Sequence, residues 1–162
     1  MSEAYVAVGS NQNAPANIRE ALQHLRTRYG ELRVSAAYES ADTNGGAAPY
    51  VNLVVSFESI LPAGQLLAEL RDVERICGRD RSIQTASCPL DLDLLLVGNA
   101  VVEDGPLKLP HPELVRRPYM LRPLVDLAAT MTHPSLGLTF EDLWDKLGGQ
   151  HRSLHRFPYP LG

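Results

Sequence analysis

Cysteine is scarce in this sequence: Cys77 and Cys88 are the only two among 162 residues. Two cysteines do not build the disulfide framework of a small secreted domain, and their spacing matches no zinc-binding motif. No apolar run approaches the roughly 20 residues that a membrane-spanning helix needs. The N-terminus has neither the basic nor the apolar region of a signal peptide. We therefore expect free thiols and a cytoplasmic protein without a membrane partner.

An excess of positive charge is missing as well. The formal net charge is −4, which argues against nucleic acid or an anionic membrane surface as a partner. A local basic cluster can still bind a small phosphorylated ligand. The length and the hydrophobic fraction of 44% are ordinary for one globular domain with a sizeable core. We expect residues 1–162 to form a single domain that acts as a monomer on small-molecule substrates.

Hydrophobic periodicity predicts alternating strands and helices. Strands are predicted over 4–8, 32–40, 50–59 and 88–99, and helices over 17–29, 61–78, 118–129 and 141–147. Asn17 with Glu20 resembles a capping box, and Thr139 is expected to cap the last helix. The order β-α-β-β-α-β in the first 97 residues is typical of the ferredoxin-like fold, an α+β class with an antiparallel sheet and helices on one face. The later helices make the expected architecture three-layered, α/β/α.

Two carboxylates interrupt the most apolar of these strands. Asp91 and Asp93 are two residues apart in CPLDLDLLLVGN (88–99), so both side chains project from the same face. Like charges at that spacing repel, and the pKa of one carboxyl rises unless a cation neutralises the pair. Mg²⁺ is usually held by one or two carboxylates together with substrate phosphates. The pair therefore indicates either a Mg²⁺ site or an exposed strand face where both groups are merely solvated.

Several cations flank this strand in the sequence. Arg79 and Arg81 lie between the second helix and the aspartates, where they are either solvated or positioned to bind phosphate oxygens through their planar forks of donors. Arg116 and Arg117 stand at a predicted helix start, where the helix dipole disfavours positive charge. At least one of them is therefore expected to serve a ligand. His111 by itself is typical of a surface or capping histidine.

Tyr50 and Asn52 begin the third predicted strand and share one of its faces. An asparagine amide in mid-strand needs hydrogen-bonding partners if it is buried. A heterocycle with donor and acceptor edges would supply them, and so would the backbone of an adjoining turn. The sequence leaves both interpretations open.

Five motifs together resemble a known family. They are AYVAVGSN (4–11), YVN (50–52), GRDR (78–81), PLDLDLLLVGN (89–99) and LPHPELVRRPYML (109–121). They occur in the same order as in 6-hydroxymethyl-7,8-dihydropterin pyrophosphokinase, a folate-biosynthesis enzyme. The resemblance covers residues 4–147 and leaves 148–162 as a C-terminal tail. It implies transfer of the terminal pyrophosphate of ATP to the hydroxymethyl group of the pterin, with release of AMP.

The resemblance also implies roles for individual residues. Such enzymes hold two Mg²⁺ ions on the strand aspartates, here Asp91 and Asp93, which would be catalytic together with Arg79 and Arg81. The implied ATP-binding residues are Glu74, Arg79, Arg81, His111 and Arg117. The implied pterin-binding residues are Ser40, Tyr50, Asn52 and Tyr119, the last of which would stack on the pterin where the family usually has phenylalanine. Segments 41–49 and 78–89 resemble the catalytic loops that close over the substrates.

The segment before the aspartates departs from the family pattern. Cys88 stands where the family has a phosphate-side arginine, and its pterin-stacking aromatic falls near Thr85. Three hypotheses therefore stay open. The chain is an active pyrophosphokinase with a divergent loop, or a paralogue that acts on another hydroxymethyl pterin such as that of a methanopterin-type cofactor. The third is a non-catalytic module that binds a nucleotide or a pterin.

Overall fold

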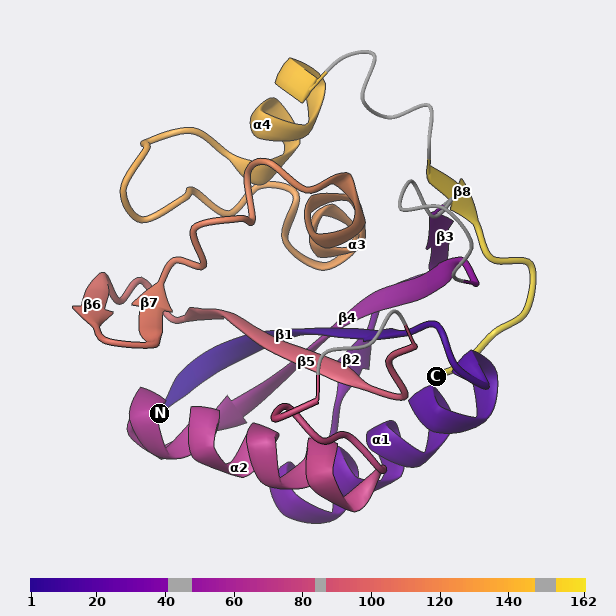
Figure 1. Ribbon diagram of the computed structural model, residues 1–162. Helices are drawn as coiled ribbons and strands as arrows, with labels where there is room; N and C mark the ends of the chain where they lie inside the picture. Colours follow the sequence, from indigo (N-terminus) through magenta and orange to yellow (C-terminus); the bar gives the residue numbers. More distant parts are fainter. Residues whose placement is uncertain (41–47, 84–86, 148–153) are drawn as a thin grey trace.

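The computed structural model describes residues 1–40, 48–83, 87–147 and 154–162 (Figure 1). Its strands are β1 (Ser2–Ser10), β2 (Arg33–Val34), β3 (Tyr38–Ser40), β4 (Tyr50–Ser59), β5 (Asp91–Val97), β6 (Val102–Asp104), β7 (Leu107–Leu109) and β8 (Leu154–Arg156). Its helices are α1 (Ala14–Tyr29), α2 (Ala63–Ile76), α3 (Pro118–Ala128) and α4 (Phe140–Leu147). No helix in this part of the chain is long and apolar enough to cross a membrane.

The main sheet has the strand order β5-β1-β4-β3-β8, and β2 also pairs with β4. Every pairing in it is antiparallel. With α1 and α2 as the two crossover helices, this is the ferredoxin-like β-α-β-β-α-β arrangement expected from the sequence. The predicted fold class is confirmed. The two central strands, β1 and β4, pair along nine residues from Ser2↔Ser59 to Ser10↔Val51.

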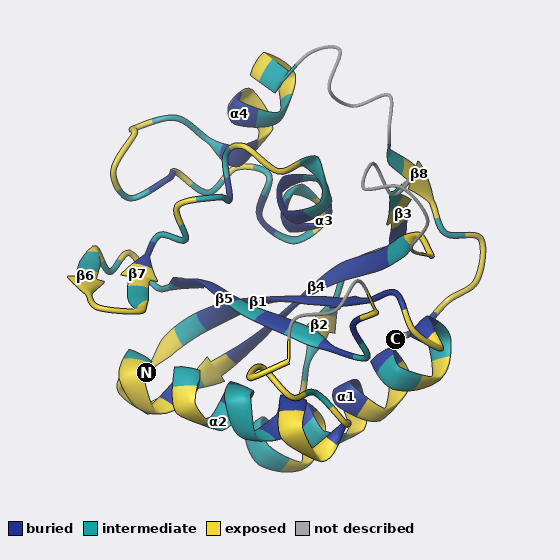
Figure 2. Ribbon diagram, in the orientation of Figure 1, coloured by how far each residue is buried: buried dark blue, intermediate teal, exposed yellow. Residues whose placement is uncertain are grey.

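Helices cover both faces of the sheet (Figures 1 and 2). On one face, α1 and α2 pack against alternate strand residues such as Val8 and Leu92 in one buried cluster. On the other face, α3 and α4 pack against Ala7, Val54 and Leu95 in a second cluster. The α/β/α layering is therefore confirmed. Because side chains alternate along a strand, β5 contributes to both clusters and holds its aspartates on the α3 side.

Two of the differences between the predicted and the observed elements have a clear local cause. The strand predicted over 32–40 is broken, because Ser35 donates its N–H to the Val54 carbonyl (2.9 Å) and accepts the Val54 N–H on its Oγ (2.8 Å). The first helix starts at Ala14 with a proline in its first turn, so the capping box assigned to Asn17 is wrong. Thr139 does cap α4, since its Oγ1 accepts the Asp142 N–H at 3.2 Å.

The described part of the C-terminal tail docks on the sheet. Strand β8 pairs with β3, and the Phe157 N–H donates to the Ala37 carbonyl at 2.9 Å. Leu161 is buried in the first core cluster. The tail therefore extends the sheet beyond β3 and covers part of α1's side of the core.

Candidate active site

The two aspartates stand at the start of β5, on the face that α3 and α4 cover farther along. Asp91 pairs with Gly9 and Asp93 with Ala7 of β1. Burial raises the pKa of the Asp93 carboxyl, and the neighbouring Asp91 carboxylate raises it further. The repulsion expected from the sequence is therefore present. Two adjacent oxygen donors in partly buried surroundings are a donor set that fits Mg²⁺.

Glu74, in the last turn of α2, connects that helix to the aspartate strand. Its side chain is only 1% exposed. It accepts hydrogen bonds from Arg81 Nε (2.7 Å) and Nη2 (2.8 Å), from Arg71 Nη1 (3.1 Å) and from the Leu92 N–H (2.7 Å). Leu92 lies between the two aspartates, so this carboxylate holds both the strand and an arginine in place.

Arg79 and Arg81 converge on Asp91. Arg81 Nη2 lies 3.2 Å and Arg79 Nη1 3.5 Å from Asp91 Oδ1. Gly78 follows the C-cap of α2 and, with φ +96°, lies in the left-handed region that favours glycine. The chain turns there so that the Arg79 N–H donates to the Glu74 carbonyl (2.8 Å). The turn brings both predicted catalytic arginines to the aspartates. Two guanidinium groups and two carboxylates thus form one charged cluster.

His111 approaches the same aspartates from the segment before α3. With Arg71 and Asp93 it lines a small pocket of about 110 Å³. Its Nδ1 accepts the Glu113 N–H at 3.1 Å, so the proton of the neutral ring is on Nε2. Burial lowers the pKa of His111. The imidazole is therefore a neutral donor facing the site.

Arg117 and Tyr119 lie at the start of α3. Arg117 is the N-cap residue, and its Nε is 3.1 Å from Glu113 Oε2. That ion pair offsets the unfavourable interaction between the Arg117 charge and the helix dipole. This interaction was the reason for expecting a ligand at Arg116 or Arg117. The pKa of Tyr119 is raised by burial and, to a smaller extent, by Asp93 and Asp91. Its half-buried ring is therefore close enough to the aspartates to be influenced by their charge.

Three of the four residues predicted to bind the pterin, Ser40, Tyr50 and Asn52, come from β3 and β4. Asn52 is 6% exposed and pairs with Gly9 across β1, while Tyr50 pairs with Ser40. Burial raises the pKa of Tyr50 to about 12, and the neighbouring Cys88 adds to the rise. The sheet places Asn52 on the same face as the aspartates, because both Asn52 and Asp91 pair with Gly9.

Because Gly9 has no side chain, the Asn52 side chain can occupy the space beside it. A Cβ added at Gly9 would collide with Asn52 Oδ1. We expect Gly9→Ala to displace that amide and to lower the free energy of unfolding by about 1–3 kcal/mol, a typical cost of overpacking. Gly64→Ala is the matched control, because a Cβ there meets nothing within 4 Å. It should change stability by less than about 1 kcal/mol. Urea denaturation measures both, and equal stabilities would contradict the expectation.

The sequence interpretation missed the role of Ser10 and Asn11. Asn11 Oδ1 accepts the Cys88 N–H (2.6 Å), and the Asn11 N–H donates to the Cys88 carbonyl (3.1 Å). The Ser10 hydroxyl donates to the same carbonyl at 3.4 Å. The end of β1 therefore holds the segment just before the aspartate strand. The GSN turn after the first strand was the available signal, but its partner 77 residues away was not visible.

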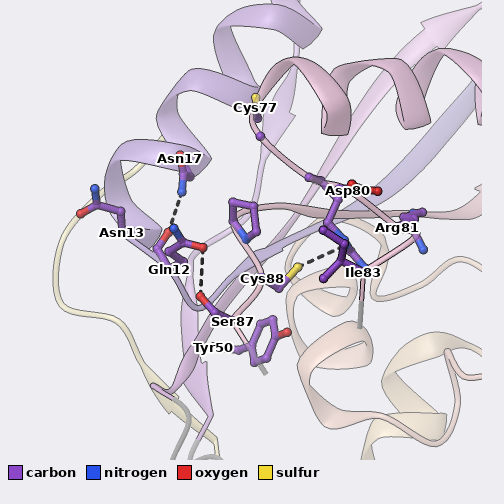
Figure 3. A pocket seen from close by; sticks show the side chains of 13 residues that line it. Gln12, Asn13, Asn17, Tyr50, Cys77, Asp80, Arg81, Ile83, Ser87 and Cys88 are labelled. Atoms are coloured by element: carbon purple, nitrogen blue, oxygen red, sulfur yellow. Dashed lines mark hydrogen bonds between the residues drawn. The ribbon is translucent and has the colours of Figure 1, made fainter. Parts of the chain in front are cut away.

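A cavity of about 750 Å³ opens beside the two arginines, with Tyr50, Arg79, Arg81 and Cys88 in its lining. Figure 3 shows Tyr50 beside Cys88, with Asp80 and Arg81 on the loop that follows α2. The volume of the cavity is in the usual range for a small-molecule site. Described residues of the predicted loop 78–89, among them Arg79, Arg81 and Cys88, line this cavity. Residues 41–47 of the other predicted loop, and 84–86, which include Thr85, lie outside the described residues.

Cys88 places a buried thiol at the position where the family has an arginine. It is 6% exposed, and Arg79 Nη1 lies 3.0 Å from its Sγ. An arginine at this position would bring a second cation against Arg79. We therefore expect Cys88→Arg to give no gain in turnover and to lower the free energy of unfolding by about 1–3 kcal/mol. Cys88→Ser, which keeps an acceptor for Arg79, should stay within about 1 kcal/mol of the natural chain. A faster Cys88→Arg variant would mean that the natural cysteine limits the reaction.

Comparison with known proteins identifies the family. The model of the 7,8-dihydro-6-hydroxymethylpterin-pyrophosphokinase family matches residues 5–129, most of the chain. The chain belongs to this family. The family resemblance inferred from the sequence motifs is thereby confirmed.

Relatives of the family differ in length. The chain is 32% identical over 139 residues to the 2-amino-4-hydroxy-6-hydroxymethyldihydropteridine pyrophosphokinase of Haemophilus influenzae, a match that covers 83% of this chain and 87% of the relative. It is 33% identical to the mitochondrial folate synthesis bifunctional protein of Arabidopsis thaliana, covering 91% of this chain but 29% of that protein. It is 30% identical to the folic acid synthesis protein fol1 of Pneumocystis carinii, covering 88% of this chain and 20% of that protein.

A solved structure supports the fold alone. The crystal structure of Plasmodium falciparum HPPK-DHPS with pterin and p-hydroxybenzoate matches with a TM-score of 0.76 at 14% identity. The match covers 96% of this chain and 46% of that one. The chain therefore corresponds to less than half of that protein, and to most of the Haemophilus enzyme.

Proposed function

We propose that this chain transfers pyrophosphate from ATP to the hydroxymethyl group of 6-hydroxymethyl-7,8-dihydropterin, a step of folate biosynthesis. The hydroxymethyl oxygen bonds to the β-phosphorus of ATP, the bond between that phosphorus and the bridging oxygen to the α-phosphate breaks, and AMP leaves. The hydroxyl proton is released. The chain is thus a transferase of the pyrophosphokinase class, and the membership of its family supports this activity. The single structural observation that carries the proposal is the convergence of Arg79 and Arg81 on Asp91, the first carboxylate of the Asp91–Asp93 pair.

We assign Glu74, Arg79, Arg81, His111 and Arg117 to the ATP side. The charged cluster supports this for Arg79 and Arg81, and Glu74 would act by positioning Arg81. Phosphoryl transfer needs positioning and charge stabilisation more than covalent help from the protein. Arg81 is held on Glu74 in a two-point contact, yet its side chain is still 42% exposed, so its remaining donors can reach a phosphate. The neutral His111 Nε2–H is a further donor on the same side. Asp91 and Asp93 would hold Mg²⁺, which when bound neutralises phosphate charge.

The β4 face supports the pterin-side assignment for Ser40, Tyr50, Asn52 and Tyr119. Asn52 offers an amide, which can both donate and accept, from a rigid central strand. Tyr119 offers an aromatic ring at the start of α3, where Asp93 and Asp91 add to the rise of its pKa. A planar heterocycle between them would have its ring near an aromatic face and its polar edge near the amide.

Three finer points remain predictions. We expect two Mg²⁺ ions rather than one, a monomer in solution, and a cytoplasmic location. Light scattering after size-exclusion chromatography tests the monomer. Turnover against free Mg²⁺ concentration tests the stoichiometry, because two ions give a steeper dependence than one.

The activity is tested by following AMP with a coupled mass-spectrometric assay. Purified chain, Mg²⁺-ATP and 6-hydroxymethyl-7,8-dihydropterin should yield AMP and the pterin diphosphate in equal amounts. Omitting the pterin is the control for ATP hydrolysis. No AMP above that background would contradict the proposal.

The departures at Cys88 and near Thr85 favour one second candidate, a kinase for another hydroxymethyl pterin. The same assay with a panel of hydroxymethyl pterins separates the two. ATP binding by calorimetry without turnover on any pterin would instead indicate a binding module.

A further inference from the structure

A second group of metal-binding side chains lies outside the aspartate site. Glu20 and His24 are one turn apart on α1, and Cys77 is the C-cap residue that directly follows α2. One donor atom from each lies within 4.8 Å of the other two, and His24 Nε2 is 3.7 Å from Glu20 Oε1. None of the three contributes to the function proposed above.

We infer that Glu20, His24 and Cys77 form a binding site for a borderline-soft divalent metal ion, with Zn²⁺ as the best fit. A thiolate, an imidazole and a carboxylate are typical zinc ligands, whereas Mg²⁺ prefers oxygen ligands only. The fourth position would be open to water. On binding, the Cys77 thiol releases its proton to solvent.

The geometry needs little adjustment. Ligands of a tetrahedral zinc ion, at about 2.0–2.3 Å from the metal, stand roughly 3.5 Å apart. The donor atoms therefore need to approach one another by at most about 1.3 Å from their spread of 4.8 Å. Glu20 is exposed and His24 partly exposed, so their side chains can move, while the buried Cys77 provides the fixed ligand.

The position of Cys77 distinguishes the two cysteines. Figure 3 shows Cys77 at the far rim of the cavity from Cys88, with its sulfur directed away from that residue. The cysteine spacing in the sequence matched no zinc motif because the other two donors come from α1, more than 50 residues earlier. A metal here would tie α1 to the end of α2, at the base of the loop that carries Arg79.

The test is a Co²⁺ and Zn²⁺ titration of the reduced, untagged chain with excess Mg²⁺, so that the aspartate site is occupied. We expect one Co²⁺ per chain, a thiolate-to-cobalt charge-transfer band, and displacement of Co²⁺ by Zn²⁺. Cys77→Ser should abolish the band. His24→Gln and Glu20→Gln, both on an accessible helix face, should each weaken binding by about 100-fold or more, since even residues behind metal ligands typically contribute 10–100-fold.

Two matched variants serve as controls. Cys88→Ser removes the other thiol, and His155→Gln removes an exposed histidine on β8. Both should bind as the natural chain does. A band that persists in Cys77→Ser, a band lost in Cys88→Ser, or the absence of saturable binding would each overturn the inference. Circular dichroism of every variant shows whether it is folded. If Cys77→Ser does not fold, His24→Gln and Glu20→Gln still decide the test.

Discussion

Asp93→Ala should reduce turnover by at least about 10²–10³-fold while the chain stays folded. Losing one preorganised electrostatic group in an active site commonly costs this much. Asp93 is expected to matter more than most, because it is the inner of the two carboxylates proposed to hold Mg²⁺ and lies beside His111 and Arg71. Initial rates of AMP formation at saturating ATP, pterin and Mg²⁺ measure the effect.

The Asp93 carboxylate should lower the stability of the fold although turnover requires it. The pKa of Asp93 is raised in the folded chain. Folding therefore costs free energy above the unfolded pKa, and that cost disappears as the pH falls below it. Asp93→Asn is neutral and of the same size, so at pH 7 without divalent metal it should raise the melting temperature although it abolishes turnover.

Asp104→Ala, on the exposed β6 strand, is the matched control. It should keep both turnover and melting temperature. Near-normal turnover of Asp93→Ala would contradict the assignment of the aspartates. A lower melting temperature of Asp93→Asn would show that the carboxylate is stabilised in the folded chain by partners other than a metal.

Glu74→Gln should cost about 3 kcal/mol of unfolding free energy, measured by urea denaturation. Breaking a buried ion pair typically costs about 3–5 kcal/mol, and the lower end applies because Arg71 and Arg81 are partly exposed and can be hydrated. The amide NH₂ of glutamine would also face guanidinium donors. The Leu92 N–H, which Glu74 accepts at 2.7 Å, would lose its charged partner.

The Glu74→Gln variant should also affect substrate binding, because it releases Arg81. Without its two-point contact, the guanidinium is no longer held toward Asp91, so we expect a higher KM for ATP with a smaller change in KM for the pterin. Glu31→Gln, an exposed glutamate just after α1, should stay within about 0.5 kcal/mol and leave both KM values unchanged. Equal effects of the two variants would mean that Glu74 does not organise the site.

Much of the fold was predictable because its signals are local. Periods of 2 and 3.6 residues identified the strands and helices in their order, and that order implies the ferredoxin-like sheet. The errors were local as well. A side-chain bond from Ser35 breaks one predicted strand, and Pro15 starts α1 earlier than the expected cap at Asn17. Hydrogen-bonding side chains and proline override a hydrophobic pattern at such points.

By itself, the sequence determined that Asp91 and Asp93 share a face, since that follows from the alternation of any strand. Only the tertiary structure decided which groups surround them. Glu74 reaches Leu92 across 18 residues, and Asn11 reaches Cys88 across 77. The physical reason is that such contacts depend on which strands are neighbours in the sheet. Because β1 lies between β5 and β4, Gly9 brings Asp91 and Asn52 together, which no local pattern records.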